Sequence, residues 1–195
     1  MRKIIFVTRN KGKFEDAAKI LAEYKIKVIQ KIMPIPESQS WSVKEIAIEK
    51  ANFVKRHLKA PFIVEDSGFY IPSLGGFPAS QVNFVLETIG IEGLLTLLKR
   101  KDRYCEFRYA LVYFEPRLEK PIIFEHKDKG YISNKILDKE IEHSWSPLVK
   151  IFIPQGFNRP LADAKVNKKF HENWSKISHI RKFGQWLSKK RDSSG

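Results

Sequence analysis

Residues 3–13 read Lys-Ile-Ile-Phe-Val-Thr-Arg-Asn-Lys-Gly-Lys. The first five form an apolar run typical of a buried strand, and residues 8–13 are polar and turn-forming. Apolar residues then recur at helical spacing between Phe14 and Tyr24, which predicts a helix directly after the loop. A strand that passes through a short polar loop into a helix indicates an α/β protein.

The polar loop is also suited to binding an anion. Backbone N–H groups at the start of a helix lack intrahelical partners and carry partial positive charge. Gly12 lets the backbone approach a phosphate, Lys13 supplies a mobile cation and Asn10 an amide donor. The spacing is not that of a Walker A loop. The alternative is ordinary capping by Asn10 with solvated lysines, which local chemistry alone favours.

Residues 62–68 read Phe-Ile-Val-Glu-Asp-Ser-Gly. The apolar start predicts a buried strand at residues 62–65, and we expect an acidic turn from Glu65 to kink the chain before the sheet continues at residues 69–71. Adjacent carboxylates at Glu65 and Asp66 cost desolvation energy unless they are paired or bind a metal. Mg²⁺ takes one or two carboxylates together with water and substrate phosphates. A simple turn capped by Asp66 or Ser67 is the alternative, but it gives the second carboxylate no role.

The remaining pattern completes an α/β fold with a mixed sheet. Runs of strand-forming residues at 104–114 and 122–132 predict a long hairpin. We expect shorter strands at 28–29 and 151–153, helices at 43–58, 81–88, 92–101 and 177–190, and loops at 33–42 and 74–78. Because strands and helices do not alternate strictly, the sheet should mix parallel and antiparallel pairs.

The composition limits the class of protein. The chain has 195 residues, 43% of them hydrophobic, which suffices for one core in a single domain or two joined lobes. A single cysteine, Cys105, excludes a disulfide framework and a multi-thiolate metal site. No apolar run reaches the ~18 residues that span a bilayer, and the start does not resemble a signal peptide. We therefore expect a soluble cytoplasmic protein with a ragged tail at residues 192–195.

The formal net charge of +14 is concentrated at the two ends of the chain. Residues 1–30 carry eight basic and three acidic side chains, and residues 159–195 carry ten and three. One interpretation is solubility with weak attraction to polyanions, and the other is that both ends meet at one anionic ligand. The sequence alone does not choose between these interpretations.

Four further residues are weaker candidates when taken singly. Glu37 is either a ligand or an exposed loop carboxylate, and Lys50 is either a ligand or a lysine whose stem packs along its helix. Trp145 either stacks on a base or packs internally. His179 either bonds a ligand or is an ordinary surface or core histidine. For each of them alone, the structural explanation is the commoner one.

Taken in order, the motifs resemble one family. They are T-x-N-x-x-K from residue 8, I-P-E-x-Q at 35–39, E-I-A-I-E-K at 45–50, V-E-D-S-G at 64–68, L-G-G-F-P at 74–78, E-T-I-G-I-E-G-L-L at 87–95 and I-S-H at 177–179. This set resembles the inosine triphosphate pyrophosphatase family over nearly the whole chain. The run at 88–98 is most similar to the archaeal branch.

The resemblance implies a fold and an activity. The fold would be an elongated mixed sheet flanked by helices, a single domain over residues 1–191 with two lobes and a central cleft. The activity would be Mg²⁺-dependent hydrolysis of non-standard purine nucleoside triphosphates, namely ITP, dITP and XTP, to the monophosphate and pyrophosphate. Most members of the family are homodimers, and their work is to clean the nucleotide pool.

The resemblance also assigns roles to single residues. Residues that match substrate contacts are Thr8, Asn10, Lys13, Lys50 and Ser67, with Trp145 and His179 toward the base. Residues that match the metal site are Glu37, Asp66 and, through water, Glu65. Asp66 matches the general base, which would activate water for attack near the α-phosphorus while the metal and lysines spread the developing charge.

The segment expected to read the base departs from the family pattern. The aromatic-Gly-aromatic-Asp-Pro segment of the family is here His-Ser-Trp-Ser-Pro at residues 143–147, so its aspartate is Ser146. The lysine and arginine of the family near I-S-H are Trp174 and Ile180, and Asn83 stands where some members carry a lysine. Each lost donor removes a charge-assisted hydrogen bond of ~1.5–3 kcal/mol. The neighbouring cations that could substitute for them are Lys176 and Arg181.

Three hypotheses follow, in order of preference. The first is an active pyrophosphatase on non-standard purine triphosphates, and the second is the same enzyme with altered base specificity. The third is a relative that binds nucleotides or nucleic acid without catalysis, which the net charge motivates; we expect nucleic acid to bind non-specifically at most. The joint presence of the phosphate and metal residues favours an enzyme.

Overall fold

The computed structural model describes residues 1–36, 38, 40–139 and 146–192. Its centre is a seven-stranded sheet of order β2-β1-β3-β5-β6-β7, with β4 paired to β3. The strands are β1 (Arg2–Val7), β2 (Ile26–Lys31), β3 (Phe62–Tyr70), β4 (Pro78–Ala79), β5 (Tyr104–Phe114), β6 (Ile122–Ile132) and β7 (Phe152–Pro154). β1 runs parallel to β2 and β3, and the other pairs are antiparallel. The predicted α/β fold with a mixed sheet is confirmed.

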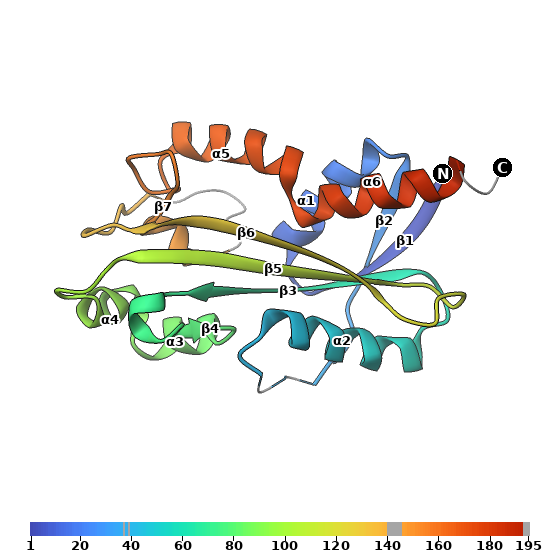
Figure 1. The fold of residues 1–195 in the computed structure, drawn as a ribbon, viewed down its shortest axis with the longest axis horizontal. Coiled ribbons are helices and arrows are strands. Elements are labelled where there is room, and N and C mark those ends of the chain that lie inside the picture. Colours follow the sequence, from blue (N-terminus) through green and yellow to red (C-terminus); the bar gives the residue numbers. More distant parts are fainter. Residues whose placement is uncertain (37, 39, 140–145, 193–195) are drawn as a thin grey trace.

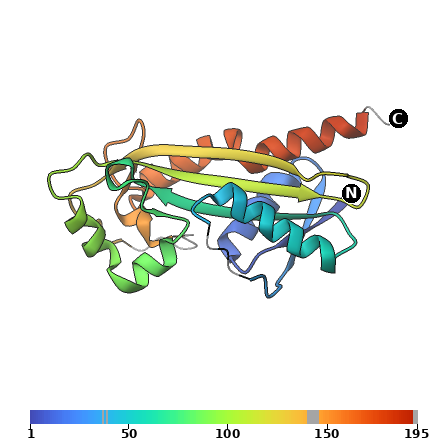
Figure 2. The ribbon, with the colours of Figure 1, turned by 60° about the horizontal axis from the view of Figure 1, so that its bottom comes forward.

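Helices cover both faces of the sheet (Figure 1). The α-helices are α1 (Lys11–Ala22), α2 (Val43–His57), α3 (Val82–Thr88), α4 (Gly90–Leu97), α5 (Ala164–Ile177) and α6 (His179–Asp192), with short 3₁₀ turns η1 (Pro72–Leu74) and η2 (Pro147–Lys150). α1, α5 and α6 lie on one face and α2 lies on the other (Figure 1), and the turned view again shows α6 and α2 on opposite sides of the sheet (Figure 2). Each face therefore has its own apolar core beneath its helices.

The hairpin of β5 and β6 gives the molecule its length. Both strands have the predicted bounds, and they pair antiparallel from Tyr104–Tyr131 to Tyr113–Ile122. The inner strand β5 is buried along most of its length, while alternate residues of β6 reach solvent. Figure 1 shows the hairpin running along the long axis, so it forms a continuous wall behind the elements that carry the site.

The prediction of a turn at residues 65–68 is wrong. β3 continues without interruption through these residues and pairs with β5 along its whole length. Gly68 lies where a Cβ atom would sit 2.5 Å from the carbonyl oxygen of Ala79 and 2.9 Å from Val43 Cγ1. The glycine therefore lets β4 and α2 approach the strand closely, and it does not mark a chain reversal.

The helix predicted over residues 177–190 is α6, which begins at His179, and a further helix, α5, precedes it. Ser178 has an extended backbone and separates α5 from α6. α5 was not predicted, because its buried residues Val166, Phe170 and Trp174 stand alone among polar neighbours. Asp163 fixes the start of α5, since its side chain accepts hydrogen bonds from the backbone N–H groups of two residues in the first turn.

The sequence predicted no membrane-spanning segment and a ragged tail at residues 192–195. Within the part of the chain that the structure describes, no helix is both long and apolar enough to cross a bilayer. The predicted tail begins at Asp192, which is the last residue of α6, and the rest of it lies outside the described residues. The first and last described elements, β1 and α6, bring both ends of the chain to the same end of the molecule (Figure 1).

Candidate functional site

A pocket of about 350 Å³ opens where β1 and β3 separate. The two strands pair at Ile5–Phe62 and Phe6–Ile63, after which β1 stays with β2 and β3 continues along β5. The carboxyl end of β1 and the middle of β3 therefore face each other across a gap. The charged and polar lining side chains are Thr8, Arg9, Asn10, Lys13, Lys50, Glu65, Asp66, Ser67, Ser80, Asn83 and Ser146.

The loop after β1 is organised by two local hydrogen bonds. Thr8 Oγ1 accepts from the Asn10 N–H at 3.1 Å, and Asn10 Oδ1 accepts from the Lys13 N–H at 2.9 Å. Asn10 is therefore the N-cap of α1, as the plainer interpretation of the sequence predicted. The same two side chains line the pocket, so capping and exposure to a ligand coexist at this loop.

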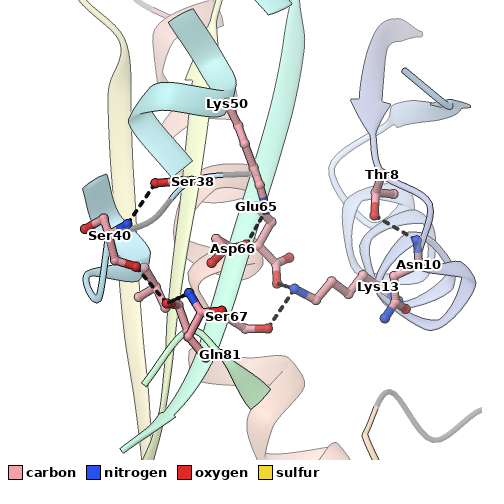
Figure 3. A network of polar contacts seen from close by, with 12 residues as sticks. Thr8, Asn10, Lys13, Ser38, Ser40, Lys50, Glu65, Asp66, Ser67 and Gln81 are labelled. Atoms are coloured by element: carbon pink, nitrogen blue, oxygen red, sulfur yellow. Dashed lines mark hydrogen bonds and ion pairs between the residues drawn. The ribbon is translucent and has the colours of Figure 1, made fainter. Parts of the chain in front are cut away.

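Because successive side chains of a strand point to opposite faces, β3 divides its polar residues between two layers. Glu65 and Ser67 point toward α1, where Lys13 Nζ lies 2.7 Å from Ser67 Oγ and 3.3 Å from Glu65 Oε1. Asp66 points toward α2, where it pairs with Lys50. Figure 3 shows the two lysines approaching β3 from different sides. Two helices thus each contribute one cation to the same strand.

Glu65 is a buried carboxylate with a partner at each oxygen. Lys13 lies at Oε1, and His179 Nε2 lies 3.2 Å from Oε2. Burial alone would raise the pKa of Glu65, but the charges of Lys13 and His179 outweigh burial and lower the pKa to about 2. The carboxylate is therefore ionised throughout the physiological range, and it joins α1, β3 and α6 at one point.

His179 is the first residue of α6 and is completely buried. Its ring stacks on Tyr109 at a centroid distance of 5.1 Å and meets the edge of Trp174 at 5.9 Å. Tyr109 and Trp174 also line a small cavity of about 20 Å³ next to Glu65, with Asp16 on its wall. Burial, with a smaller contribution from the charge of Glu65, raises the pKa of Asp16 to about 6. This side of β3 is thus closely packed around its charged groups.

The two predicted cations of the C-terminal segment do not meet the pocket. Arg181 donates to Glu23 through Nη1 and Nη2, at 2.7 and 2.9 Å, and to the Tyr24 hydroxyl at 3.0 Å. Lys176 is exposed at the end of α5. Neither residue is part of the pocket wall, whose cationic side chains are Arg9, Lys13 and Lys50 within the described part of the chain.

Two predicted site residues, Glu37 and Trp145, lie outside the described residues. Ser146, which follows Trp145, is described: it lines the pocket, and its Oγ accepts from the Leu148 N–H at 3.3 Å at the start of η2. The position that the resemblance assigns to an aspartate thus caps a turn at the pocket wall.

Comparison with known proteins identifies the family of the chain. The profile of the Ham1 family matches residues 4–182. The chain belongs to the Ham1 family. A protein of Methanopyrus kandleri named dITP/XTP pyrophosphatase is 37% identical over 189 residues, which is 94% of this chain and 95% of that protein. A protein of the same name from Thermococcus kodakarensis is 31% identical over 190 residues, which is 95% of this chain and 97% of that protein.

Solved structures of Ham1 proteins share the fold. A HAM1 protein from Coxiella burnetii superposes with a TM-score of 0.78 at 21% identity, and the Staphylococcus aureus Ham1 protein with 0.75 at 22%; both matches cover 100% of each chain. At this level of identity the likeness establishes the architecture. The profile match over residues 4–182 and the relatives of 31–37% identity confirm the family resemblance carried by the motifs.

Sequence reasoning missed several residues of this Ham1 pocket. Arg9 lies inside the recognised loop motif but was not singled out, and its basic side chain beside Asn10 was the available signal. Ser80 reaches the pocket from the turn after β4 and Phe107 from β5, and no local pattern marks them. Ser80 donates to the carbonyl of Ser40 at 2.8 Å, which fixes the loop before α2 against the pocket rim.

The chemistry of the Ham1 pocket suits a polyphosphate. Three cationic side chains and the N-terminus of the twelve-residue helix α1 face an opening that also presents one accessible carboxylate, Asp66. A ligand with several negative charges would neutralise the cations, and Asp66 would remain available as a hydrogen-bond acceptor for water. This combination of charges is the basis for the proposal below.

Proposed function

We propose that the protein hydrolyses dITP, XTP and ITP to the nucleoside monophosphate and pyrophosphate, and so removes non-standard purine nucleotides from the pool. The observation that carries the proposal is the convergence of Lys13, Lys50 and Asp66, from three different elements, on one pocket. The relatives named dITP/XTP pyrophosphatase, which match nearly the full length of the chain, support the choice of substrate.

The residues of this chain would divide the work as follows. Lys13 and Lys50, with Arg9, bind the phosphate charges, and the N–H groups at the start of α1 add fixed donors. Asp66 orients a water molecule and accepts its proton as the water oxygen attacks the α-phosphorus. The bond between the α-phosphorus and the bridging oxygen breaks, and pyrophosphate leaves. Lysines that contact the leaving phosphates stabilise the charge that develops there.

A Mg²⁺ ion fits the acceptor groups at this site. The described residues contain no group of three or more acidic, histidine or cysteine side chains that could form an all-protein cage. Mg²⁺ usually needs only one or two carboxylates besides water and phosphates. Asp66 would supply one, and Glu37 is the proposed second. When bound, the ion would neutralise phosphate charge and polarise the reacting phosphorus.

The direct test is a panel of triphosphates with and without Mg²⁺, in which released pyrophosphate is measured. We expect kcat/KM for dITP and XTP to exceed the values for ATP, GTP and dTTP. Removal of divalent ions with EDTA should abolish release. If no triphosphate in the panel yields pyrophosphate, the proposal is wrong.

A second candidate is the same reaction with altered base selection, and one observation favours it. The residues that stand where the resemblance expects cationic base contacts, Trp174 and Ile180, are buried in the core. Arg181 is committed to Glu23 on the outer surface. Equal turnover of dITP and ATP or dTTP in the same panel would support this candidate over the first.

We also propose a homodimer, as the resemblance implies. Three large apolar side chains, Phe84, Ile89 and Leu97, are at least two-fifths exposed around α3 and α4 and offer a candidate contact face. Light scattering coupled to size exclusion should give twice the chain mass of 22.8 kDa. A Phe84→Ser variant should shift the mass toward the monomer; an unchanged mass would place the contact elsewhere.

A further inference from the structure

We infer that Glu65 is a positioning residue that holds Lys13 toward the substrate phosphates and does not itself bind the metal. This inference rests on the proposed function, because it concerns how the same pocket grips a triphosphate. It departs from the role that the family resemblance assigns to Glu65, a metal contact through water. The three observations that carry it are the direction of the side chain, its two partners and its burial.

The direction of Glu65 follows from the strand. Because β3 pairs with β5 in unbroken register, with Glu65 opposite Leu111 and Asp66 opposite Ala110, the two carboxylates leave the backbone on opposite faces. Leu111 belongs to the core beneath α1 and α6, and Ala110 belongs to the core beneath α2. Both carboxylates border the pocket, but they approach it from opposite faces of β3, so Glu65 does not stand beside Asp66 as a second ligand on the same face.

The partners of Glu65 leave its oxygens little capacity for a metal. Lys13 lies at Oε1 and His179 at Oε2, and the side chain is only 3% exposed. A cation placed on either oxygen would lie against an ammonium or an imidazole and would be repelled when the neighbour is charged. Asp66, which is 14% exposed and faces the pocket with one lysine, meets no such obstacle.

The effect of Glu65 on Lys13 follows from how the N–H donors of the Lys13 ammonium group are used. An ammonium has three N–H groups, of which one points to Ser67 Oγ at 2.7 Å and one to Glu65 Oε1 at 3.3 Å. The third remains for a phosphate oxygen. Glu65 and Ser67 therefore restrict a flexible four-carbon side chain to one direction before the substrate arrives, and this lowers the entropic cost of binding.

The first test measures binding without metal. Calorimetry in EDTA would use the α,β-imido analogue of dITP as a probe that is not hydrolysed. Lys13→Ala and Glu65→Gln should each weaken binding about 10- to 100-fold. The double variant should be no weaker than Lys13→Ala, because Glu65 acts through Lys13. A matched control is Glu125→Gln, the same change at an exposed carboxylate, which should bind normally.

The second test measures turnover against Mg²⁺ concentration. Glu65→Gln should raise KM more than it lowers kcat, with an unchanged Mg²⁺ concentration for half-maximal rate. Glu65→Asp keeps the charge, and with it the fold, but its side chain is shorter by one methylene group. This variant should recover part of the affinity that Glu65→Gln loses. Thermal unfolding of each variant shows whether a loss of affinity or turnover comes from misfolding. If Glu65→Gln does not fold, the same measurements on Glu65→Asp decide the question.

The outcomes separate this inference from the proposed function. If Glu65→Gln binds the analogue normally in EDTA but needs ten times more Mg²⁺, Glu65 is a metal contact and the inference is overturned. Failure of the unmodified protein to bind the analogue overturns it as well. If no triphosphate is hydrolysed while analogue binding depends on Lys13 and Glu65, the inference stands and the proposed reaction alone is wrong.

Discussion

The neighbouring carboxylates Glu65 and Asp66 lie on opposite faces of strand β3 and have different surroundings. Glu65 is sealed beneath α1 and α6 between Lys13 and His179, whereas Asp66 opens to the pocket beside α2. One carboxylate stabilises the arrangement of three elements, and the other is accessible to water and ligand. Residues that are adjacent in the sequence thus belong to separate layers, because a strand alternates its side chains.

The contrast gives the pocket one closely packed wall and one accessible carboxylate. The packed face holds its charges in fixed positions, with aromatic rings around His179. The open face leaves Asp66 with a single lysine partner, which a substrate phosphate can compete for.

The largest effect is expected from Asp66→Asn on the open face. Loss of the proton acceptor should lower kcat for dITP by about 10²–10⁴-fold, while the free energy of unfolding changes by less than about 1 kcal/mol, because the partner lysine is partly solvated. Pyrophosphate release and urea unfolding measure the two quantities. Turnover within tenfold of the unmodified protein would remove Asp66 from the reaction.

Gly68→Ala tests whether β4 and α2 must pack closely against β3 on the face that carries Asp66. The added Cβ would meet the carbonyl oxygen of Ala79 at 2.5 Å, so backbone must move. We expect a loss of about 2–3 kcal/mol in the free energy of unfolding, measured by urea titration. An unchanged unfolding midpoint would mean that β4 and α2 yield readily at this position.

Asp16→Asn tests the electrostatics of the packed face. Burial and the charge of Glu65 raise the pKa of Asp16 to about 6, so the folded protein holds this proton more tightly than the unfolded chain. The contribution to stability is therefore lost as pH rises from about 4 to 6. The variant should be about 1–2 kcal/mol more stable than the unmodified protein at pH 7.5, with a smaller difference at pH 4.5.

The control for this prediction is Glu125→Gln, a change at an exposed carboxylate of β6. It should leave the pH dependence of unfolding as it is in the unmodified protein. A stabilisation by Asp16→Asn that is equal at both pH values would contradict the assignment of the raised pKa.

Arg181→Ala is expected to have the smallest effect. Its guanidinium pairs with exposed Glu23, and such pairs contribute less than about 1 kcal/mol. Because the side chain points away from the pocket, KM for dITP should change less than twofold. A KM increase of tenfold or more would restore the role in base recognition that the sequence suggested for this residue.

Much of the fold could be predicted because local patterns were strong. The alternation and length of β5 and β6, and the strand–loop–helix order around Thr8, were enough to locate those elements. Residues 65–68 were predicted as a turn because glutamate, aspartate, serine and glycine disfavour strands; pairing with β5 over the whole length overrides that preference. Long-range pairing of this kind leaves no local signal.

The candidate site was predictable to the extent that its residues sit in ordered motifs. Thr8, Asn10, Lys13, Lys50 and Asp66 do line one pocket. The face of the sheet to which Glu65 points, by contrast, could be predicted only if residues 65–68 were recognised as part of a strand. The commitment of Arg181 to Glu23 depended on a contact between residues 158 positions apart. Charge counts at the two ends of the chain could not reveal that α6 brings only its first residue, His179, toward the site.

The hydrogen bond between Ser146 and the N–H of Leu148 has a consequence for how such enzymes diversify. An aspartate accepts the same backbone bond equally well, so serine and aspartate are interchangeable for the turn. The side chain nevertheless faces the ligand pocket. Exchange between serine and aspartate would therefore change the charge of the pocket wall while leaving the turn at the start of η2 as it is.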